Sequence, residues 1–228
     1  MAQKFVFQLP HKFFIILCML SVAISMACGL VAFKMVSFGS LTNTGQVFIF
    51  PLLFCFADVI AEVFGVLAAR FVIYFQLVCS FIFVTLILLI IRLPSPSTWH
   101  LQEAYNQVLN PMFGLHVGVL VGTFCNSLIN IHLLSKWKLL TKGKYFWLRS
   151  TGASCIGILV YTITAAPIAY RHIFNNLFDL LEFSLIRTIS NVVLVTFYTI
   201  FSAMLVRYLK TRLNTDVYGV ASFNPFKL

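Results

Sequence analysis

Six apolar segments dominate the sequence, and each is long enough to cross a lipid bilayer as a helix. They run over residues 13–35, 46–69, 71–91, 111–134, 150–170 and 184–208. A helix crosses the roughly 30 Å of bilayer hydrocarbon in about 20 residues. A water-soluble fold could not bury so much apolar surface, since 61% of the chain is hydrophobic and only 10% is charged. We therefore predict an all-α polytopic membrane protein whose six spans form one domain over residues 1–228.

The connections between the spans are short. Little more than Arg70 separates the second span from the third, which predicts a tight helical hairpin. The third span ends before Pro94 and Pro96, where a helix cannot continue, and a polar loop follows up to Pro111. Apolar residues recur at helical spacing between positions 171 and 190, so we expect a piece of helix along the membrane interface before the last span.

The orientation follows from the lysines and arginines. When the loops are assigned alternately to the two sides, twelve of these residues fall on the side of both termini and four on the other side. The positive-inside rule then places both termini in the cytoplasm of a bacterium, with the chain in the inner membrane. The formal charge of +10 lies at the ends of the spans. We therefore expect it to face lipid headgroups and expect no nucleic acid partner.

Two carboxylates lie inside the second span. Asp58 and Glu62 are four residues apart, so both project from one face of a helix. A carboxylate at this depth is costly and should face a cavity or a partner. We expect at least one of them to bind a solute or a coupling proton. The alternative is a structural ion pair with Arg70 or Arg187.

Polar side chains also line the fourth and sixth spans. Small residues at Gly114, Gly118 and Gly122 predict close packing on one face of the fourth span. The opposite face carries four polar side chains, which are His116, Thr123, Ser127 and Asn130. In the last span Arg187 and Asn191 share a face in the same way, although Arg187 could instead reach the interface. This pattern is typical of helices that border a central binding site.

The remaining motifs exclude several classes of protein. The six cysteines lie in apolar runs without the spacing of a metal or redox site. We find no phosphate-binding glycine loop, no HExxH and no nucleophile elbow. We therefore expect no catalytic residues, no metal and no cofactor. Most tryptophans and tyrosines near the span ends fit an aromatic belt, while Trp99 and Tyr105 could alternatively form a gate that stacks on an aromatic solute.

Two sequence blocks carry a family resemblance. The first contains Phe50-Pro51, Asp58-Val59-Ile60-Ala61-Glu62-Val63-Phe64-Gly65 and Ala69-Arg70. The second contains Asn130-Ile131-His132-Leu133-Leu134, a lysine-rich loop and Gly143-Lys144-Tyr145-Phe146-Trp147-Leu148-Arg149. Together they resemble the queuosine precursor transporter family, a group of small, six-span, vitamin-uptake-transporter-like proteins of bacterial inner membranes. The family is similar in architecture to the substrate-binding subunits of energy-coupling-factor transporters.

The resemblance implies uptake of queuine or another 7-deazaguanine precursor of the tRNA base queuosine. It adds Ser154 and Tyr161 of the fifth span to the expected substrate site. Tyr161 stands where relatives carry an inward-facing Asp, and Arg187 stands where they often carry Lys. These departures could change which deazapurine base is accepted, or mark a paralogue for another planar solute.

Several alternatives stay open. The chain could capture solute and depend on an energising partner, or it could be a membrane protein without transport activity. Homo-oligomers are compatible with the sequence. Proton symport and facilitated diffusion are equally compatible with it.

Overall fold

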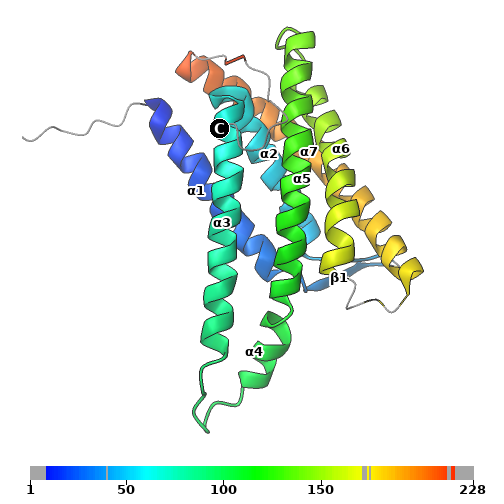
Figure 1. Cartoon of the computed structure of the whole chain (residues 1–228). Coiled ribbons are helices and arrows are strands. Elements are labelled where there is room, and N and C mark those ends of the chain that lie inside the picture. Colours follow the sequence, from blue (N-terminus) through cyan, green and yellow to red (C-terminus); the bar gives the residue numbers. More distant parts are fainter. Residues whose placement is uncertain (1–8, 40, 171–173, 175, 215–216, 219–228) are drawn as a thin grey trace, which may run out of the picture.

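The computed structural model describes residues 9–39, 41–170, 174, 176–214 and 217–218. Six long helices form a bundle: α1 (Leu9–Leu30), α2 (Gln46–Phe64), α3 (Val66–Ile91), α5 (Met112–Leu140), α6 (Phe146–Ala169) and α7 (Leu177–Leu213) (Figure 1). Each is long and apolar enough to span a membrane, α5 together with the short α4 (Gln102–Leu109) before it. The predicted all-α, six-span fold is confirmed.

A short β-hairpin and a short helix lie at one end of the bundle. Strands β1 (Met35–Phe38) and β2 (Leu41–Thr44) form an antiparallel hairpin in which Met35 pairs with Thr44. Helix α4 lies at the same end (Figure 1). We call this the hairpin end. The prediction was wrong in continuing the first span to residue 35 and in placing only loop between α3 and α5. An apolar composition marks membrane residues but not the point at which a helix stops.

Two helix boundaries also differ from the prediction. The chain turns between α2 and α3 at Gly65, whose φ of 96° is strained for any residue with a Cβ. Arg70 is therefore not in the turn but buried in α3. Residues 177–190 belong to the continuous α7, which at 37 residues is about 55 Å long and must tilt or extend past the bilayer. The rest of the predicted interfacial piece includes 171–173 and 175, which lie outside the described residues.

Helix α2 forms the centre of the bundle. It packs against α1, α3, α5, α6 and α7, and it is the most buried of the candidate spans. At the end opposite the hairpin, the α2–α3 turn, the α5–α6 loop and the end of α7 come together (Figure 1). We call this the basic end, because buried Lys138 and Arg149 and partly buried Lys210 meet there.

Helices α5 and α6 pack closely because of glycines in α5. A Cβ on Gly118 would lie 2.9 Å from the Ala165 carbonyl oxygen, and one on Gly122 would lie 2.7 Å from the Ala165 Cβ. A Cβ on Gly114 would meet no atom within 4 Å. Small-residue packing is thus confirmed at two of the three predicted positions. It brings the polar groups of α5 and α6 near those of α2.

Gly118→Ala is therefore expected to lower the thermal stability of the purified protein, because its Cβ would meet backbone atoms of α6 that cannot move cheaply. Gly114→Ala is the matched control in the same helix. It should leave the melting temperature unchanged or raise it slightly, since alanine stabilises a helix by about 0.5–1 kcal/mol over glycine. Equal melting temperatures for the two variants would contradict the observed packing.

Candidate functional site

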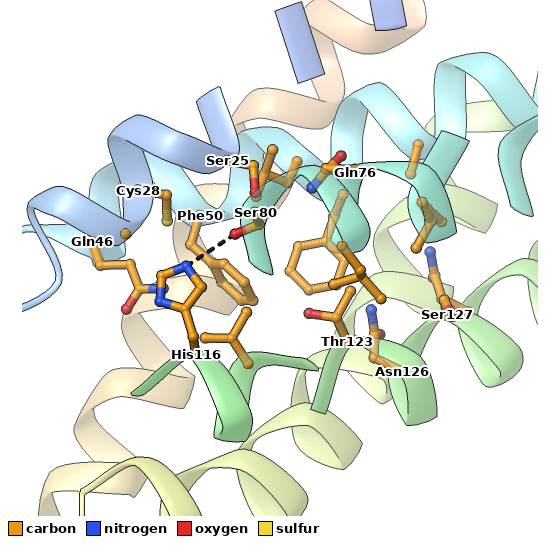
Figure 2. Close-up of a pocket in the computed structure, with 18 residues that line it drawn as sticks. Ser25, Cys28, Gln46, Phe50, Gln76, Ser80, His116, Thr123, Asn126 and Ser127 are labelled. Atoms are coloured by element: carbon orange, nitrogen blue, oxygen red, sulfur yellow. Dashed lines mark hydrogen bonds between the residues drawn. The ribbon is translucent and has the colours of Figure 1, made fainter. Parts of the chain in front are cut away.

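A cavity lies between α1, α2, α3 and α5, lined by 18 residues (Figure 2). Its α3 residues, Ile73 to Ser80, lie in the middle of that helix, whereas Gln46 and His116 lie near the starts of α2 and α5. The cavity therefore extends from the bundle centre toward the hairpin end. Half of its lining is polar and consists of Ser25, Gln46, Gln76, Ser80, His116, Thr123, Asn126, Ser127 and Asn130.

No Asp, Glu, Lys or Arg is among these described lining residues. The polar groups are amides, hydroxyls and one imidazole, which offer both donors and acceptors. Among the apolar residues, Phe50 and Phe54 pack edge to face with ring centroids 5.0 Å apart. The lining therefore combines apolar aromatic surface with groups that donate and accept hydrogen bonds.

The imidazole of His116 is fixed by two hydrogen bonds. Its Nδ1 lies 3.1 Å from the Met112 carbonyl oxygen, and its Nε2 lies 2.9 Å from the Ser80 hydroxyl (Figure 2). A carbonyl oxygen only accepts, so in the neutral ring Nδ1 donates to Met112 and Nε2 accepts from Ser80. His116 thus joins α3 to α5 and orients the Ser80 hydroxyl at the cavity wall.

A buried carboxylate orients Asn130. Asp58 is fully buried and accepts hydrogen bonds from Asn130 Nδ2 at 2.9 Å, from the Ser150 hydroxyl, and from the Ser154 hydroxyl at 3.3 Å. Because the Asn130 amide nitrogen donates to Asp58, its Oδ1 points elsewhere, and this buried oxygen has no hydrogen-bond partner among the described residues. Asn130 lines the cavity and therefore offers it a free hydrogen-bond acceptor.

The neighbouring Asn126 is held by close packing. A Cβ on Gly157 of α6 would collide with Asn126 Oδ1, and this oxygen is also buried without a hydrogen-bond partner in the described structure. Only glycine at position 157 leaves space for the amide. With its oxygen against α6, Asn126 directs its NH₂ group toward the cavity (Figure 2).

Behind Gln46 lies a buried arginine. Arg187 Nη2 donates to Gln46 Oε1 at 2.8 Å, and Nη1 donates to the Tyr170 hydroxyl. All three side chains are buried. Because the Gln46 oxygen accepts from Arg187, the NH₂ group of Gln46 is the part left to face the cavity. Arg187 is thus buried inside the bundle and does not extend to its surface.

Glu62 lies at the basic end, where three cations surround it. Its carboxylate accepts two hydrogen bonds from Arg149, at 3.1 and 3.2 Å, and one from Lys210 at 2.7 Å. Lys138 lies 3.3 Å from the same carboxylate and donates to the carbonyl oxygens of Glu62 and Val217. The ion pairs thus join α2, α5, α6 and α7, and their partners are not the predicted Arg70 or Arg187.

The structure places the ten predicted site residues in three groups. His116, Thr123, Ser127 and Asn130 line the cavity. A second group is buried but does not line the cavity, and it consists of Asp58, Ser154, Tyr161, Arg187 and Asn191. Tyr161 packs on the cavity residue Phe50 with ring centroids 4.5 Å apart. Glu62 forms the third group, and it is away from the cavity.

Sequence reasoning missed five polar lining residues, namely Ser25, Gln46, Gln76, Ser80 and Asn126. A signal for some of them was present. Gln76 and Ser80 are polar residues four apart in an otherwise apolar span, and Asn126 follows Thr123 by three residues on the predicted polar face. Gln46 begins its helix, where a polar residue carries little information.

The fold and the cavity define a polytopic membrane protein with an internal polar site for a small molecule. Residues 44–217 match the family model described as "Putative vitamin uptake transporter". The chain belongs to this family, and its class is that of solute uptake proteins. No curated protein and no solved structure matched the chain.

The charge cluster at the basic end generates a stability prediction. Glu62→Gln would leave Lys138, Arg149 and Lys210 without their shared carboxylate. We expect a loss of unfolding free energy on the order of 3 kcal/mol, typical of breaking a buried ion pair. It should appear as a lower melting temperature in detergent. Glu103→Gln, on the exposed α4, is the matched control.

Little change is expected for the control variant, since Glu103 is exposed and its one contact within the described residues is a long hydrogen bond from Gln107. If Glu62→Gln melts at the wild-type temperature, the cluster does not hold the helices together. Its carboxylate would then be open to another role.

Proposed function

We propose that this chain imports a planar nitrogen heterocycle across the bacterial inner membrane, with a 7-deazaguanine-type base such as queuine or its precursors as the solute. The observation that carries the proposal is the cavity between α1, α2, α3 and α5, which combines two phenylalanine rings with amide and hydroxyl groups and lacks charged lining residues among those described.

The chemistry of the lining suits such a base. One flat face would stack on either the Phe50 or the Phe54 ring, which stand at 89° to each other; such stacking is worth on the order of 1–3 kcal/mol per base in single-strand binding proteins. A guanine-like edge offers adjacent N–H donors and a carbonyl acceptor. The unpartnered Asn130 Oδ1 supplies an acceptor for the N–H groups, while the Asn126 and Gln76 amides supply donors. Amide groups thus form the hydrogen bonds to the base for which the sequence suggested a carboxylate.

Binding requires the cavity to widen. Its volume is about 50 Å³, enough for water, whereas sites for drug-sized ligands usually measure roughly 300–1,000 Å³. Helix α2 contains a suitable weak point. Pro51 lies inside the helix beside Phe50 and has no N–H to donate to the carbonyl of Val47. Movement of the first turns of α2 would open the space between Phe50 and α5.

The distribution of charge supports the proposed direction. The basic end carries exposed Lys136, Lys142 and Lys144 near buried Lys138 and Arg149. Under the positive-inside rule this end and both termini are cytoplasmic. The cavity approaches the hairpin end, which would then face outward, where an imported solute arrives.

The same basic end is compatible with a second function, solute capture for an energising partner. Lys136 near the end of α5 and Lys142 and Lys144 in the α5–α6 connection are exposed. They form a surface that an acidic subunit could contact. The cavity and its solute would be the same. Uptake by liposomes that contain this chain alone would exclude a required partner, whereas binding without uptake would favour one.

The proposed function is tested in bacteria that lack both queuosine synthesis and their own transporter. Cells expressing this chain are fed queuine or individual 7-deazaguanine precursors at low concentration, and queuosine in tRNA is measured. We expect at least one compound to restore the modified base. Failure of every compound, with the protein confirmed in the membrane, would contradict the proposed solute class.

Thr123→Val tests the cavity itself, because it removes a hydroxyl that points into the space in Figure 2 and keeps the side-chain shape. Loss of one hydrogen bond to the solute should reduce uptake at low solute by about fivefold to tenfold. Thr196→Val is the control, since Thr196 is exposed on α7 and bonds only within its helix. Equal uptake by the two variants would place the solute elsewhere.

A further inference from the structure

Arg187 is a buried cation surrounded by uncharged groups. The residue is 3% exposed, and its guanidinium donates hydrogen bonds to the Tyr170 hydroxyl and the Gln46 amide oxygen. The guanidinium also lies over the Tyr170 ring, 4.9 Å from its centroid. Its Nε has no hydrogen-bond partner among the described residues. Among the described residues the charge is therefore solvated by dipoles and has no counter-ion.

No carboxylate in the described structure is placed to neutralise it. Asp58 is held by Asn130, Ser150 and Ser154, and Glu62 is held by the cations of the basic end. On α7 itself, Asp179 and Glu182 lie in the first two turns and are exposed. A buried charge without a partner is costly, and in a membrane protein such a residue usually serves a ligand.

The polar groups around Arg187 are also incompletely used. Asn191, one helical turn further along α7, is fully buried, and neither atom of its amide has a partner in the described part of the chain. A fold that needed Arg187 only for packing would satisfy these groups, because unpaired polar atoms in a buried site cost free energy of their own. The region is instead polar and cationic, and several of its polar atoms have no hydrogen-bond partner among the described residues.

Gln46 connects this region to the cavity. Its oxygen accepts from Arg187, while the residue itself lines the cavity beside Cys28. A donated hydrogen bond from a guanidinium polarises the amide, so the NH₂ group of Gln46 becomes a stronger donor toward the cavity. At the low dielectric of this site, the positive charge also acts on any group bound next to Gln46.

We infer that the solute carries a carboxylate, bound at the Gln46 end of the cavity, where Arg187 compensates its charge. This inference rests on the proposed function and narrows it. The heterocycle would lie between Phe50 and the Asn126–Asn130 face, and the acidic substituent would point toward the hairpin end. Among bases of this class, one with a cationic amine substituent would meet the positive charge and bind less tightly than one with a carboxylate.

The test compares three derivatives of 7-deazaguanine that differ only in the 7-substituent, namely a carboxylate, the matching carboxamide and an aminomethyl group. Equilibrium binding to the purified protein in lipid nanodiscs is measured by calorimetry. We expect the carboxylate to bind at least about tenfold more tightly than the carboxamide, in line with a charge-assisted hydrogen bond. The aminomethyl compound should bind most weakly.

Two changes test whether Arg187 sets this order. Arg187→Lys retains the charge and should keep the preference for the carboxylate, whereas Arg187→Gln should remove it. Tyr161→Asp is an independent variant, because Tyr161 lies beside Arg187 and a carboxylate there would neutralise the guanidinium from within the protein. It should also lose the preference, even if Arg187→Gln proves unstable.

The outcomes separate the two proposals. Equal or tighter binding of the carboxamide by the wild-type protein would overturn the carboxylate inference and leave the 7-deazaguanine proposal intact. A carboxylate preference that survives Tyr161→Asp would overturn the role of Arg187. Binding of none of the three compounds to folded protein would overturn the proposed function and, with it, this inference.

Discussion

The candidate site depends on one buried carboxylate. Asp58 lies on the central helix α2 and accepts hydrogen bonds from Asn130 of α5 and from Ser150 and Ser154 of α6. These contacts fix the register of three helices where no water is available to replace a lost bond. They also determine which way the Asn130 amide faces. A carboxylate in a span is thus used to orient a neutral group at the cavity, which avoids exposing a charge to the solute.

Charge is placed on either side of an uncharged cavity. At the basic end, Glu62 joins three cations that come from α5, α6 and α7. Toward the hairpin end, Arg187 contacts the cavity only through Gln46. The ion cluster holds four helices together, whereas Arg187 has no counter-ion in the part of the chain that the structure describes. The Glu62 cluster is therefore structural, whereas Arg187 is a candidate for recognition of the solute.

Hydropathy alone predicted the six spans, because the bilayer imposes one length and one composition on every crossing helix. The helical repeat also placed His116, Thr123, Ser127 and Asn130 on one face of α5, and all four line the cavity. The partners of the carboxylates could not be predicted in this way. The position of Asp58 and Glu62 inside a span implied that each has a partner. Those partners lie 72 to 148 positions further along the chain. Which of them meet depends on how α5, α6 and α7 pack around α2.

The most direct test is an experimental structure of the protein in lipid nanodiscs with a bound 7-deazaguanine base. We expect density for the base between the Phe50 ring and the amides of Asn126 and Asn130, with Phe50 or the first turns of α2 displaced to admit it. Density for the base next to Glu62 at the basic end, or on a lipid-facing surface of the bundle, would contradict the assignment of this cavity as the solute site.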